Sequence, residues 1–369
     1  MPYKISGTKN ATARIIIFKE SDWSIESNTI VSGTGAYEIG GVVSGTKTII
    51  AETTAGELLG YGDVDSIKYG GQRGLFGGGG TPTNNFYDII DYITIDSTSN
   101  ATDFGDLFQA RRALSATSNG ENDRGVWAGG CVSANPEVSN DTIDYVTILI
   151  INNASNFGDL TNSRRDLAAV SNGSDDRGVF GAGTTNTWSN YLDYITISST
   201  GDATDFGDLT RLVERNASVS NKTNNRGVFA GGSNTSGKMN VIDYITINST
   251  GNATDFGDLL VANNGLSGCS NHTNNRGCFG GGETAGGSSN TIQYITINST
   301  GNATDFGDLT IWRTMRGSTS NGIDNRGVWG GGTSNADEID YITISSTGDA
   351  TDFGDLTVSR WGSAATSNS

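Results

Sequence analysis

The 369-residue chain has few residues of the kinds that build cross-links and metal sites: 3 Cys, 3 Met and a single His. Three scattered cysteines are too few for the disulfide framework of a small secreted domain. Cys269 and Cys278 are close enough in sequence to pair across a hairpin, but buried free thiols are the preferred interpretation. Nothing assembles a His-rich metal site or a catalytic triad around the one histidine, His272. We therefore expect neither an enzyme nor a bound cofactor.

Long apolar segments are also missing. No stretch of about 18 apolar residues is present, so we expect no membrane-spanning helix. The first residues, MPYKISGTKNATAR, have no apolar segment, and we do not expect them to be a signal peptide. Basic residues are the minority, 23 against 40 acidic ones, which gives a formal net charge of −17. Such a surface repels phosphate backbones and anionic lipids, so binding to nucleic acid or membranes is not expected.

What the chain does contain is typical of an all-β protein. Gly is abundant at 53 residues and Pro is limited to 3, while no long segment shows apolar residues at helical spacing. Glycine and asparagine adopt the positive φ angles of tight turns at little cost. The composition therefore predicts many short strands joined by tight turns.

One phrase, STGNATDFGDL, occupies residues 249–259 and returns unchanged at 299–309, and looser copies bring its core to six. The copies recur about every 50 residues, each preceded by a Tyr strand such as DYITI and, earlier, by an element such as RGVFAGG. Six units with four strand signals each predict a six-bladed β-propeller over residues 67–369.

The order of these motifs resembles that of kelch repeats. RGVFAGG corresponds to the strand that ends in a Gly doublet, DYITI to the Tyr strand, and ATDFGDL to the last strand, with Phe where kelch units usually have Trp. The first unit lacks the small-residue strand with which the others begin, and the chain ends on such a strand, RWGSAATSNS. The resemblance implies that the C-terminal strand closes the first blade.

Residues 1–66 have a different pattern of alternating strands and glycine turns. The run SGTGAYEIGGVVSGTKTIIAE resembles the carboxypeptidase-regulatory-like (transthyretin-like) β-sandwiches. The resemblance implies a small β-sandwich that serves as a stalk or attachment domain.

Two residues of each unit are expected to be structural. The Phe of the phrase is predicted to plug the space between neighbouring sheets, and the Arg before the Gly-apolar-aromatic element to pair with an Asp and fix the register between blades. Asx-type turns are preferred for the acidic loops over bound calcium, which stays open as an alternative. These residues are Phe104, Phe157, Phe206, Phe256, Phe306 and Phe353, and Arg73, Arg124, Arg177, Arg226, Arg276 and Arg326.

In a four-stranded antiparallel blade, A to D, the A–B and C–D turns lie on one face of the ring. The B–C loops and D–A connections lie on the other. The turns repeat nearly unchanged, whereas the loops and connections differ in every unit. Variation confined to one face predicts a surface that binds a carbohydrate or protein, although some of its aromatics are alternatively expected to cap the core. The predicted ligand-binding residues are Phe86, Tyr87, Trp188, Tyr191, Arg215, Trp312, Arg313, Arg360 and Trp361.

A small β-sandwich followed by a Gly- and Asn-rich propeller resembles appendage and decoration proteins of tailed phages. The resemblance implies a non-catalytic virion surface protein (tail fibre, baseplate appendage or capsid decoration) that is assembled in the host cytoplasm. Its N-terminal domain would attach to other virion proteins in an oligomeric assembly, and its propeller would meet a host glycan or a neighbouring subunit. The alternatives are a secreted bacterial adhesin or surface-layer component and, less favoured, a carbohydrate-active enzyme.

Overall fold

The computed structural model describes residues 72–368, apart from 82, 121–122, 186, 222–224, 272–274, 315–316 and 334–335. Of the preceding residues it describes the backbone of six strands. His272 therefore lies outside the described residues. The chain divides into two compact units, Met1–Gln72 and Arg73–Ser369. No helix of the described part is long and apolar enough to cross a membrane.

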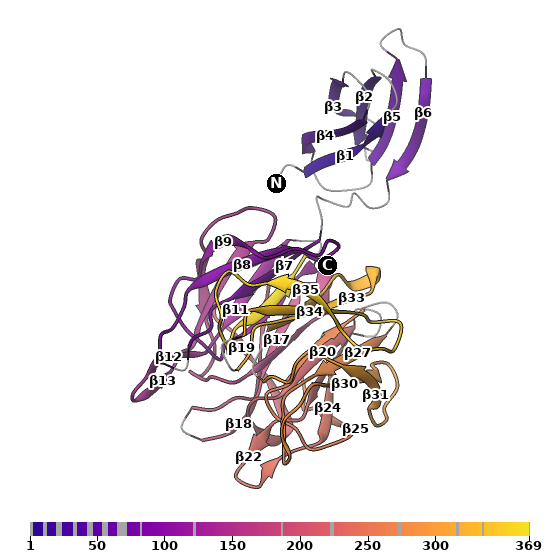
Figure 1. Ribbon diagram of the computed structural model, residues 1–369. Helices are drawn as coiled ribbons and strands as arrows, with labels where there is room; N and C mark the ends of the chain where they lie inside the picture. The colour runs from indigo at the N-terminus through magenta and orange to yellow at the C-terminus, as the bar shows by residue number, and fades with distance from the viewer. Residues whose placement is uncertain are drawn as a thin grey trace. The chain divides into compact units, whose positions relative to one another are not determined.

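The N-terminal unit contains two antiparallel sheets (Figure 1). One pairs β1 with β4, and the other has the order β3-β2-β5-β6. A β-sandwich also requires side chains to pack between the sheets, and these side chains lie outside the described residues, so the sandwich stays a prediction. The strands are β1 (Tyr3–Lys9), β2 (Ala13–Lys19), β3 (Ser24–Val31), β4 (Gly35–Val42), β5 (Lys47–Thr53) and β6 (Leu58–Val64).

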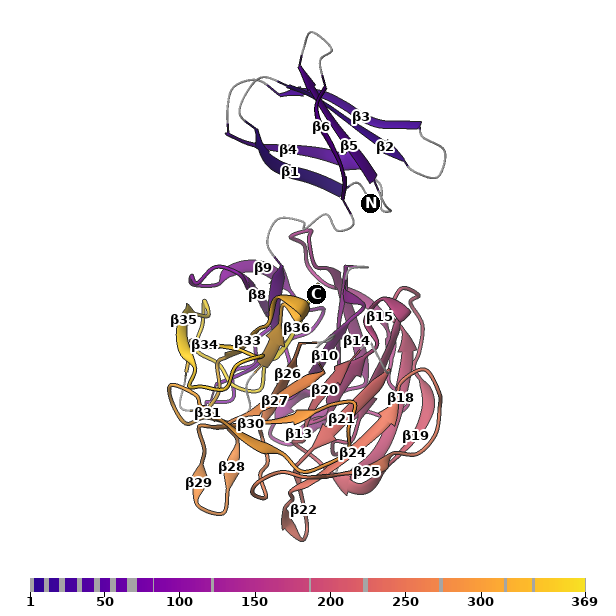
Figure 2. The same ribbon diagram turned by 90° about the vertical axis from the view of Figure 1, so that its right-hand side faces the viewer.

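The second unit is a six-bladed β-propeller, as predicted, with one four-stranded antiparallel sheet in each blade (Figures 1 and 2). Blade 1 consists of β36 (Ala364–Ser367), β7 (Arg73–Gly77), β8 (Ile89–Thr94) and β9 (Thr102–Asp106). Blade 2 consists of β10 (Ser115–Ser118), β11 (Arg124–Ala128), β14 (Thr142–Thr147) and β15 (Ser155–Asp159). Blade 3 consists of β16 (Ala168–Ser171), β17 (Arg177–Gly181), β18 (Ser189–Thr196) and β19 (Thr204–Val213).

The remaining three blades follow the same order of strands A to D. Blade 4 consists of β20 (Ala217–Asn221), β21 (Arg226–Ala230), β24 (Val241–Thr246) and β25 (Thr254–Asp258). Blade 5 consists of β26 (Ser267–Ser270), β27 (Arg276–Gly280), β30 (Thr291–Thr296) and β31 (Thr304–Asp308). Blade 6 consists of β32 (Gly317–Ser320), β33 (Arg326–Gly330), β34 (Glu338–Thr343) and β35 (Thr351–Asp355).

The ring closes through the C-terminal strand. Strand β36 pairs antiparallel with β7, with Ala364 opposite Gly77 and Ser367 opposite Gly74. The A strands β36, β10, β16, β20, β26 and β32 contact one another in turn, so they surround the central axis. Closure leaves no open edge between the first and last blades, which confirms the prediction that the last strand completes blade 1.

The propeller core consists of six apolar clusters, each formed by two neighbouring blades. In one cluster Phe104 of blade 1 packs with Trp127, Val146 and Ile148 of blade 2. Each repeated Phe is at most 3% exposed and meets the Tyr of its own blade edge to face, at 6.0–6.2 Å between ring centroids. The predicted plug between neighbouring sheets is therefore confirmed.

The repeated acidic phrase joins each blade to the next one. In blades 3 and 4, the Asp208 N–H donates to Asn252 Oδ1 at 3.1 Å, and the Ala253 N–H donates to the Asp208 carbonyl at 2.8 Å. Equivalent bonds link the other blades, with Asn or Asp as the acceptor. The predicted local Asx turn is therefore wrong, because this side chain caps a strand of the preceding blade. Within the described residues, no three His, Cys, Asp or Glu side chains gather as a metal site would require.

The recurring Arg also bridges neighbouring blades, but its partner is not the predicted Asp. Arg226 Nη1 donates to the Ile297 carbonyl of blade 5 at 3.0 Å, while its guanidinium lies 4.3 Å from the ring centroid of Tyr244 in its own blade. The five other copies make the same two contacts, and Arg326 completes the circle with Ile95 of blade 1. The register between blades thus depends on a backbone acceptor.

The cysteines are free and buried, as preferred from the sequence. Cys269 and Cys278 lie directly opposite each other on β26 and β27. Burial raises the pKa of both thiols, so they remain protonated and pack as small apolar side chains.

Candidate ligand-binding face

The B–C loops and D–A connections form one face of the propeller, which we call the variable face. Three of its B–C loops fold into short hairpins, two of which, β22–β23 and β28–β29, extend from the same end of the ring (Figure 2). The hairpins are β12 (Cys131–Ala134) with β13 (Glu137–Ser139), β22 (Ser233–Asn234) with β23 (Gly237–Lys238), and β28 (Glu283–Thr284) with β29 (Gly287–Ser288).

Beneath this face, five blades contain a buried Arg–Asp ion pair. In four of these blades the Arg belongs to the D–A connection that leads into the blade, and in blade 4 it is Arg211, near the end of β19. The Asp belongs to strand C of the same blade. Arg111 and Asp144 of blade 2 lie 2.9 Å apart with no exposed side-chain surface, and the Phe108 N–H donates to the same carboxylate. The other pairs, at 2.6–2.9 Å, are Arg164–Asp193, Arg211–Asp243, Arg313–Asp340 and Arg360–Asp91.

These pairs correct the sequence prediction for Arg313 and Arg360. Both were expected to bind ligand on the variable face, but neither has any exposed surface. Desolvation by burial lowers the pKa of the Arg360 guanidinium, and Asp91 at 2.9 Å opposes that shift. The two arginines therefore belong to the scaffold.

Blade 5 replaces both members of the ion pair by neutral residues. Gln293 occupies the Asp position and Asn263 the Arg position, and each is 3% exposed. Gln293 Oε1 accepts the Leu260 N–H at 2.8 Å, and Asn263 Nδ2 donates to the Gly281 carbonyl at 2.7 Å. A lone buried charge would be costly, which explains why the two replacements occur together.

The residue five positions after the Leu of each phrase occupies a corresponding position in every blade. In five blades its backbone exchanges two hydrogen bonds with the first residue of the B–C loop: Arg112 N–H donates to the Cys131 carbonyl, and Cys131 N–H donates back. In blade 6 the Thr333 N–H donates to the Thr314 carbonyl, but the Thr314 N–H donates to Thr333 Oγ1. In five blades backbone groups fix these positions, although the side chains of Arg112, Asn264 and Thr314 are themselves buried. We call them the variable ring, which consists of Arg112, Arg165, Glu214, Asn264, Thr314 and Trp361.

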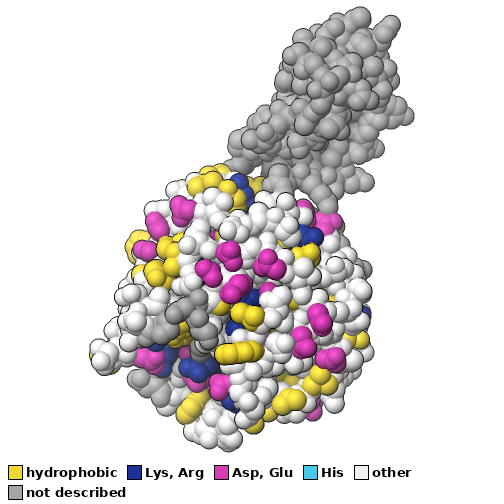
Figure 3. Space-filling model, in the orientation of Figure 1, with side chains coloured by type: hydrophobic (Ala, Val, Ile, Leu, Met, Phe, Trp, Pro, Cys, Tyr) yellow, Lys and Arg dark blue, Asp and Glu magenta, His cyan; other side chains and the backbone are white. Residues whose placement is uncertain are grey.

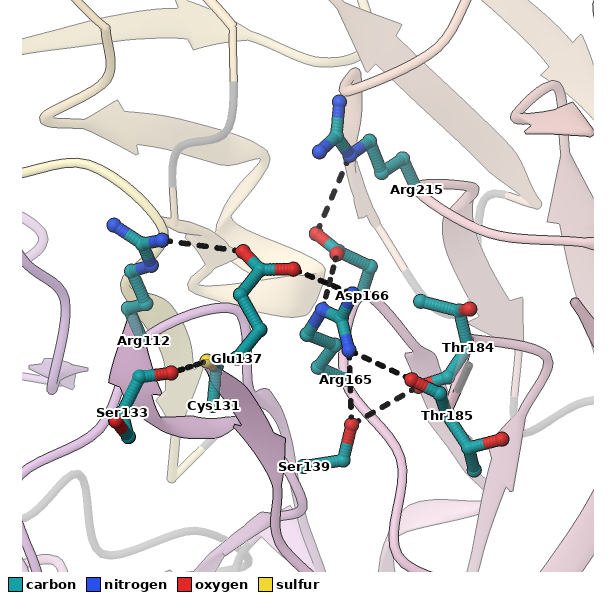
Figure 4. Close-up of polar contacts among 10 residues, drawn as sticks. All are labelled: Arg112, Cys131, Ser133, Glu137, Ser139, Arg165, Asp166, Thr184, Thr185 and Arg215. Carbon is teal, nitrogen blue, oxygen red and sulfur yellow. Dashed lines mark hydrogen bonds and ion pairs between the residues drawn. The ribbon is translucent and has the colours of Figure 1, made fainter. Parts of the chain in front are cut away.

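Two arginines of the variable ring share one carboxylate from a B–C hairpin. Glu137 lies 3.4 Å from Arg112 Nη2 and 2.6 Å from Arg165 Nη2 (Figure 4). The Arg112 guanidinium also lies between two aromatic rings, 4.8 Å from the centroid of Phe86 and 4.3 Å from that of Trp361. Arg112 is only 7% exposed, so charge, hydrogen bonds and stacking hold its guanidinium in a polar cluster that is covered except at Glu137, whose side chain is 44% exposed.

A second ring of residues lies next to the variable ring, towards the axis. Asp166 N–H donates to the Ala113 carbonyl and Arg215 N–H to the Asp166 carbonyl, each at 2.8 Å, and Gly265 and Gly362 continue the chain of bonds. Ala113, Asp166 and Arg215 have φ angles of 56–57°, in the left-handed region. Residues other than glycine rarely have such φ angles, and backbone strain of this kind is found most often at functional sites.

The Asp166 carboxylate lies between two arginines, 3.6 Å from Arg215 Nε and 3.9 Å from Arg165 Nε (Figure 4). Burial raises the pKa of Asp166, and the two arginines only partly offset this effect. Burial and the nearby Asp166 also raise the pKa of Glu214. The Arg215 side chain is 39% exposed, so part of its guanidinium is open to a ligand.

The other predicted ligand residues lie at different depths. Tyr191 and Trp312 are 48% and 58% exposed, whereas Tyr87 and Trp188 are half-buried, as are the stacked Phe86 and Trp361. Exposed apolar side chains of the D–A connections surround the same face: Phe108, Leu212, Leu260, Val261, Ile311 and Trp312.

Sequence reasoning missed Arg112, Glu137, Arg165 and Asp166. The spacing from the Leu of each phrase contained the signal. In five blades the fourth residue after that Leu is buried, as the Arg of an ion pair or as Asn263. The fifth residue after it belongs to the variable ring. Blade 4 departs from this spacing, since Val213 fills the fourth position and Arg211 makes the pair.

The described residues near the axis on this face carry balanced charges. The guanidinium groups of Arg112, Arg165 and Arg215 lie among the carboxylates of Glu137, Asp166 and Glu214. Elsewhere, on the surface visible in Figure 3, acidic side chains are spread over the propeller and basic ones are fewer. The cluster can therefore both donate and accept hydrogen bonds without strong attraction for either sign of charge.

Two comparisons with known proteins give no relatives for this chain. No family model matches the sequence, and no curated protein is significantly similar to it.

Proposed function

We propose that the propeller is a non-catalytic recognition domain whose variable face binds a glycan of a host surface. One observation carries this proposal: five of the six positions of the variable ring share the same backbone pairing while their side chains differ. Aromatic rings stack on the C–H faces of sugars, and guanidinium–carboxylate pairs offer donors and acceptors to hydroxyl groups. On this face Tyr191 and Trp312 supply exposed aromatic rings, and Arg215, whose side chain is 39% exposed, pairs with Asp166.

For the whole chain, we propose that it is a virion surface protein of a tailed phage. The N-terminal unit would attach to other virion proteins in an oligomeric assembly, and the propeller would face the host. The kelch-like character of the blades and the transthyretin-like character of the N-terminal unit belong to the same proposal, because they rest on the order of motifs along the chain.

A glycan array probed with the full chain tests the proposal. We expect binding to a defined set of glycans, and loss of that binding in Trp312→Ala and Tyr191→Ala, whose side chains are exposed on the variable face. Ile151→Ala is the matched control, because Ile151 is 57% exposed but lies in the C–D turn of blade 2, on the opposite face. A silent array, or equal loss of binding in all three variants, would contradict glycan recognition by the variable face.

A further inference from the structure

The C–D turn of blade 2 departs from its five copies. It contains Ile150 and Ile151 where every other blade has a Ser-Thr pair. The two isoleucines are 47% and 57% exposed, and the preceding Leu149 is half-buried. The turn belongs to the face opposite the variable face, which carries the A–B and C–D turns. The Ser-Thr pairs are exposed in all five blades and occupy residues 97–98, 199–200, 249–250, 299–300 and 346–347.

The fold of the turn does not require the isoleucines. Its backbone is the same in all six blades: the Ile150 N–H donates to the Thr147 carbonyl at 3.0 Å, and the Ser of each other copy makes the equivalent bond at the same length. Among the described residues, neither isoleucine belongs to the apolar clusters that blade 2 forms with its neighbours. Adjacent apolar side chains that are exposed without a role in packing indicate a surface that contacts a partner.

The same hairpin lacks a negative charge that its copies have. Asn156 of β15 is exposed, and it occupies a position at which the other five blades have an exposed Asp. The chain has a formal net charge of −17, so a second copy that approaches one of those five blades meets carboxylates of its own sign. On blade 2 this repulsion is reduced, whereas a basic partner would have been attracted by the carboxylate. The five residues are Asp103, Asp205, Asp255, Asp305 and Asp352.

We propose that Ile150 and Ile151 contact the same two residues of a second copy of this chain, so that two propellers associate through their blade 2 turns. Such a contact is isologous, and it places the apolar pair against itself across a twofold axis. Apolar surface is removed from water on both copies, and the missing carboxylate lowers the electrostatic cost of the approach. The patch is small compared with a standard interface, so the dimer is weak, with a dissociation constant on the order of 100 µM.

The repeats themselves supply variants for this contact. Ile150→Ser together with Ile151→Thr restores the turn of the other five blades, so this double variant should fold with the urea midpoint of the wild type or a higher one. Asn156→Asp restores the carboxylate that those blades have. Leu260→Thr is the matched control, because Leu260 is 50% exposed on a D–A connection of the variable face and four other blades have Thr at this position.

Sedimentation equilibrium of the full chain over a wide range of concentration measures the association. We expect the wild type to pass from monomer to dimer as its concentration rises, and the Ile150→Ser, Ile151→Thr chain to have a dissociation constant that is higher by roughly tenfold or more. Asn156→Asp should raise the dissociation constant by roughly threefold at low salt and by less at high salt, because salt screens exposed charges. Leu260→Thr should leave it unchanged.

A wild type that stays monomeric at every concentration would overturn the inference, as would an association that the double variant leaves intact or that Leu260→Thr weakens equally. No effect of Asn156→Asp at low salt would overturn the choice of a second copy as the partner. The inference is independent of the proposed function, since a glycan array is probed well below the concentration at which so weak a dimer forms. A dimer with a silent array would support this contact and refute glycan recognition, and a positive array from a monomeric chain would do the reverse.

Discussion

Replacing the Arg164–Asp193 ion pair of blade 3 by the Asn and Gln of blade 5 measures how the buried pairs stabilise the propeller. Arg164 Nη2 lies 2.8 Å from Asp193 Oδ2, and the two side chains are 0% and 1% exposed. The carboxylate also accepts hydrogen bonds from the backbone N–H and the hydroxyl of Thr161. The pair is therefore fully desolvated and held at both ends.

The expected magnitude follows from this burial. At 2.8 Å the attraction between the two charges is about 6 kcal/mol for an effective dielectric constant near 20, and desolvation offsets much of it. Arg164→Asn or Asp193→Gln alone leaves one buried charge without its partner, which should cost about 3–5 kcal/mol of unfolding free energy. The double variant leaves no charge and copies the neutral arrangement of blade 5, so we expect it to cost at most about 2 kcal/mol.

Urea unfolding of the wild type, both single variants and the double variant gives the coupling free energy. Lys238→Ala is the control, because its ion pair with Glu283 is partly exposed, at 25% and 47% for the two side chains, so its loss should cost no more than about 1 kcal/mol. If the losses of the two single variants sum to within about 0.5 kcal/mol of the loss of the double variant, the reasoning is refuted, because the two residues then do not act as a unit.

Two further predictions concern single residues. Burial raises the pKa of Asp123 from 3.8 to about 7, so the folded state keeps its proton up to a higher pH than the unfolded state does. The free energy of unfolding should therefore fall by at most about 4 kcal/mol as the pH rises from 4 to 7, and it should stay constant above pH 7. Asp123→Asn introduces the residue that blades 4 to 6 have at this position, and it should remove this pH-dependent loss of stability when urea midpoints are measured from pH 4 to 7. If the midpoints of the variant and the wild type fall in parallel, Asp123 is not the group responsible. Gly207→Ala should cost about 1–3 kcal/mol more than Gly201→Ala in urea unfolding, because only at Gly207 would the added Cβ meet a carbonyl, at 2.6 Å; equal costs would mean that backbone strain alone matters.

The fold could be predicted because the repeated unit determines it locally. The glycine doublets, the Tyr strand and the buried Phe each recur once per blade, and their spacing sets both the number of blades and the closing strand. A repeat of this kind needs no knowledge of long-range contacts, since each blade packs mainly against its two neighbours.

The candidate site was harder to predict, because adjacent residues of one type have opposite roles. Arg111 pairs with Asp144 beneath the face, whereas Arg112, which is also buried, lies against Phe86, Trp361 and the half-exposed Glu137. Only the strand register distinguishes the two. The partner of the recurring Arg was missed for a different reason: a carbonyl acceptor is present in every residue and leaves no trace in the sequence.

The difference between the two faces has a physical origin in the kind of contact that each makes. On the repeated face, the side chain of Asn252 caps a strand of the preceding blade, and a Cβ at Gly207 would meet the next blade's backbone, so a change in one copy disturbs two blades. On the variable face, reciprocal backbone hydrogen bonds hold positions such as Arg112 and Glu214, and their side chains are not needed for that geometry. A ring built in this way can therefore change the side chains at these five positions while its blades keep the same backbone pairing. The acidic phrase is therefore repeated because each copy must fit the next.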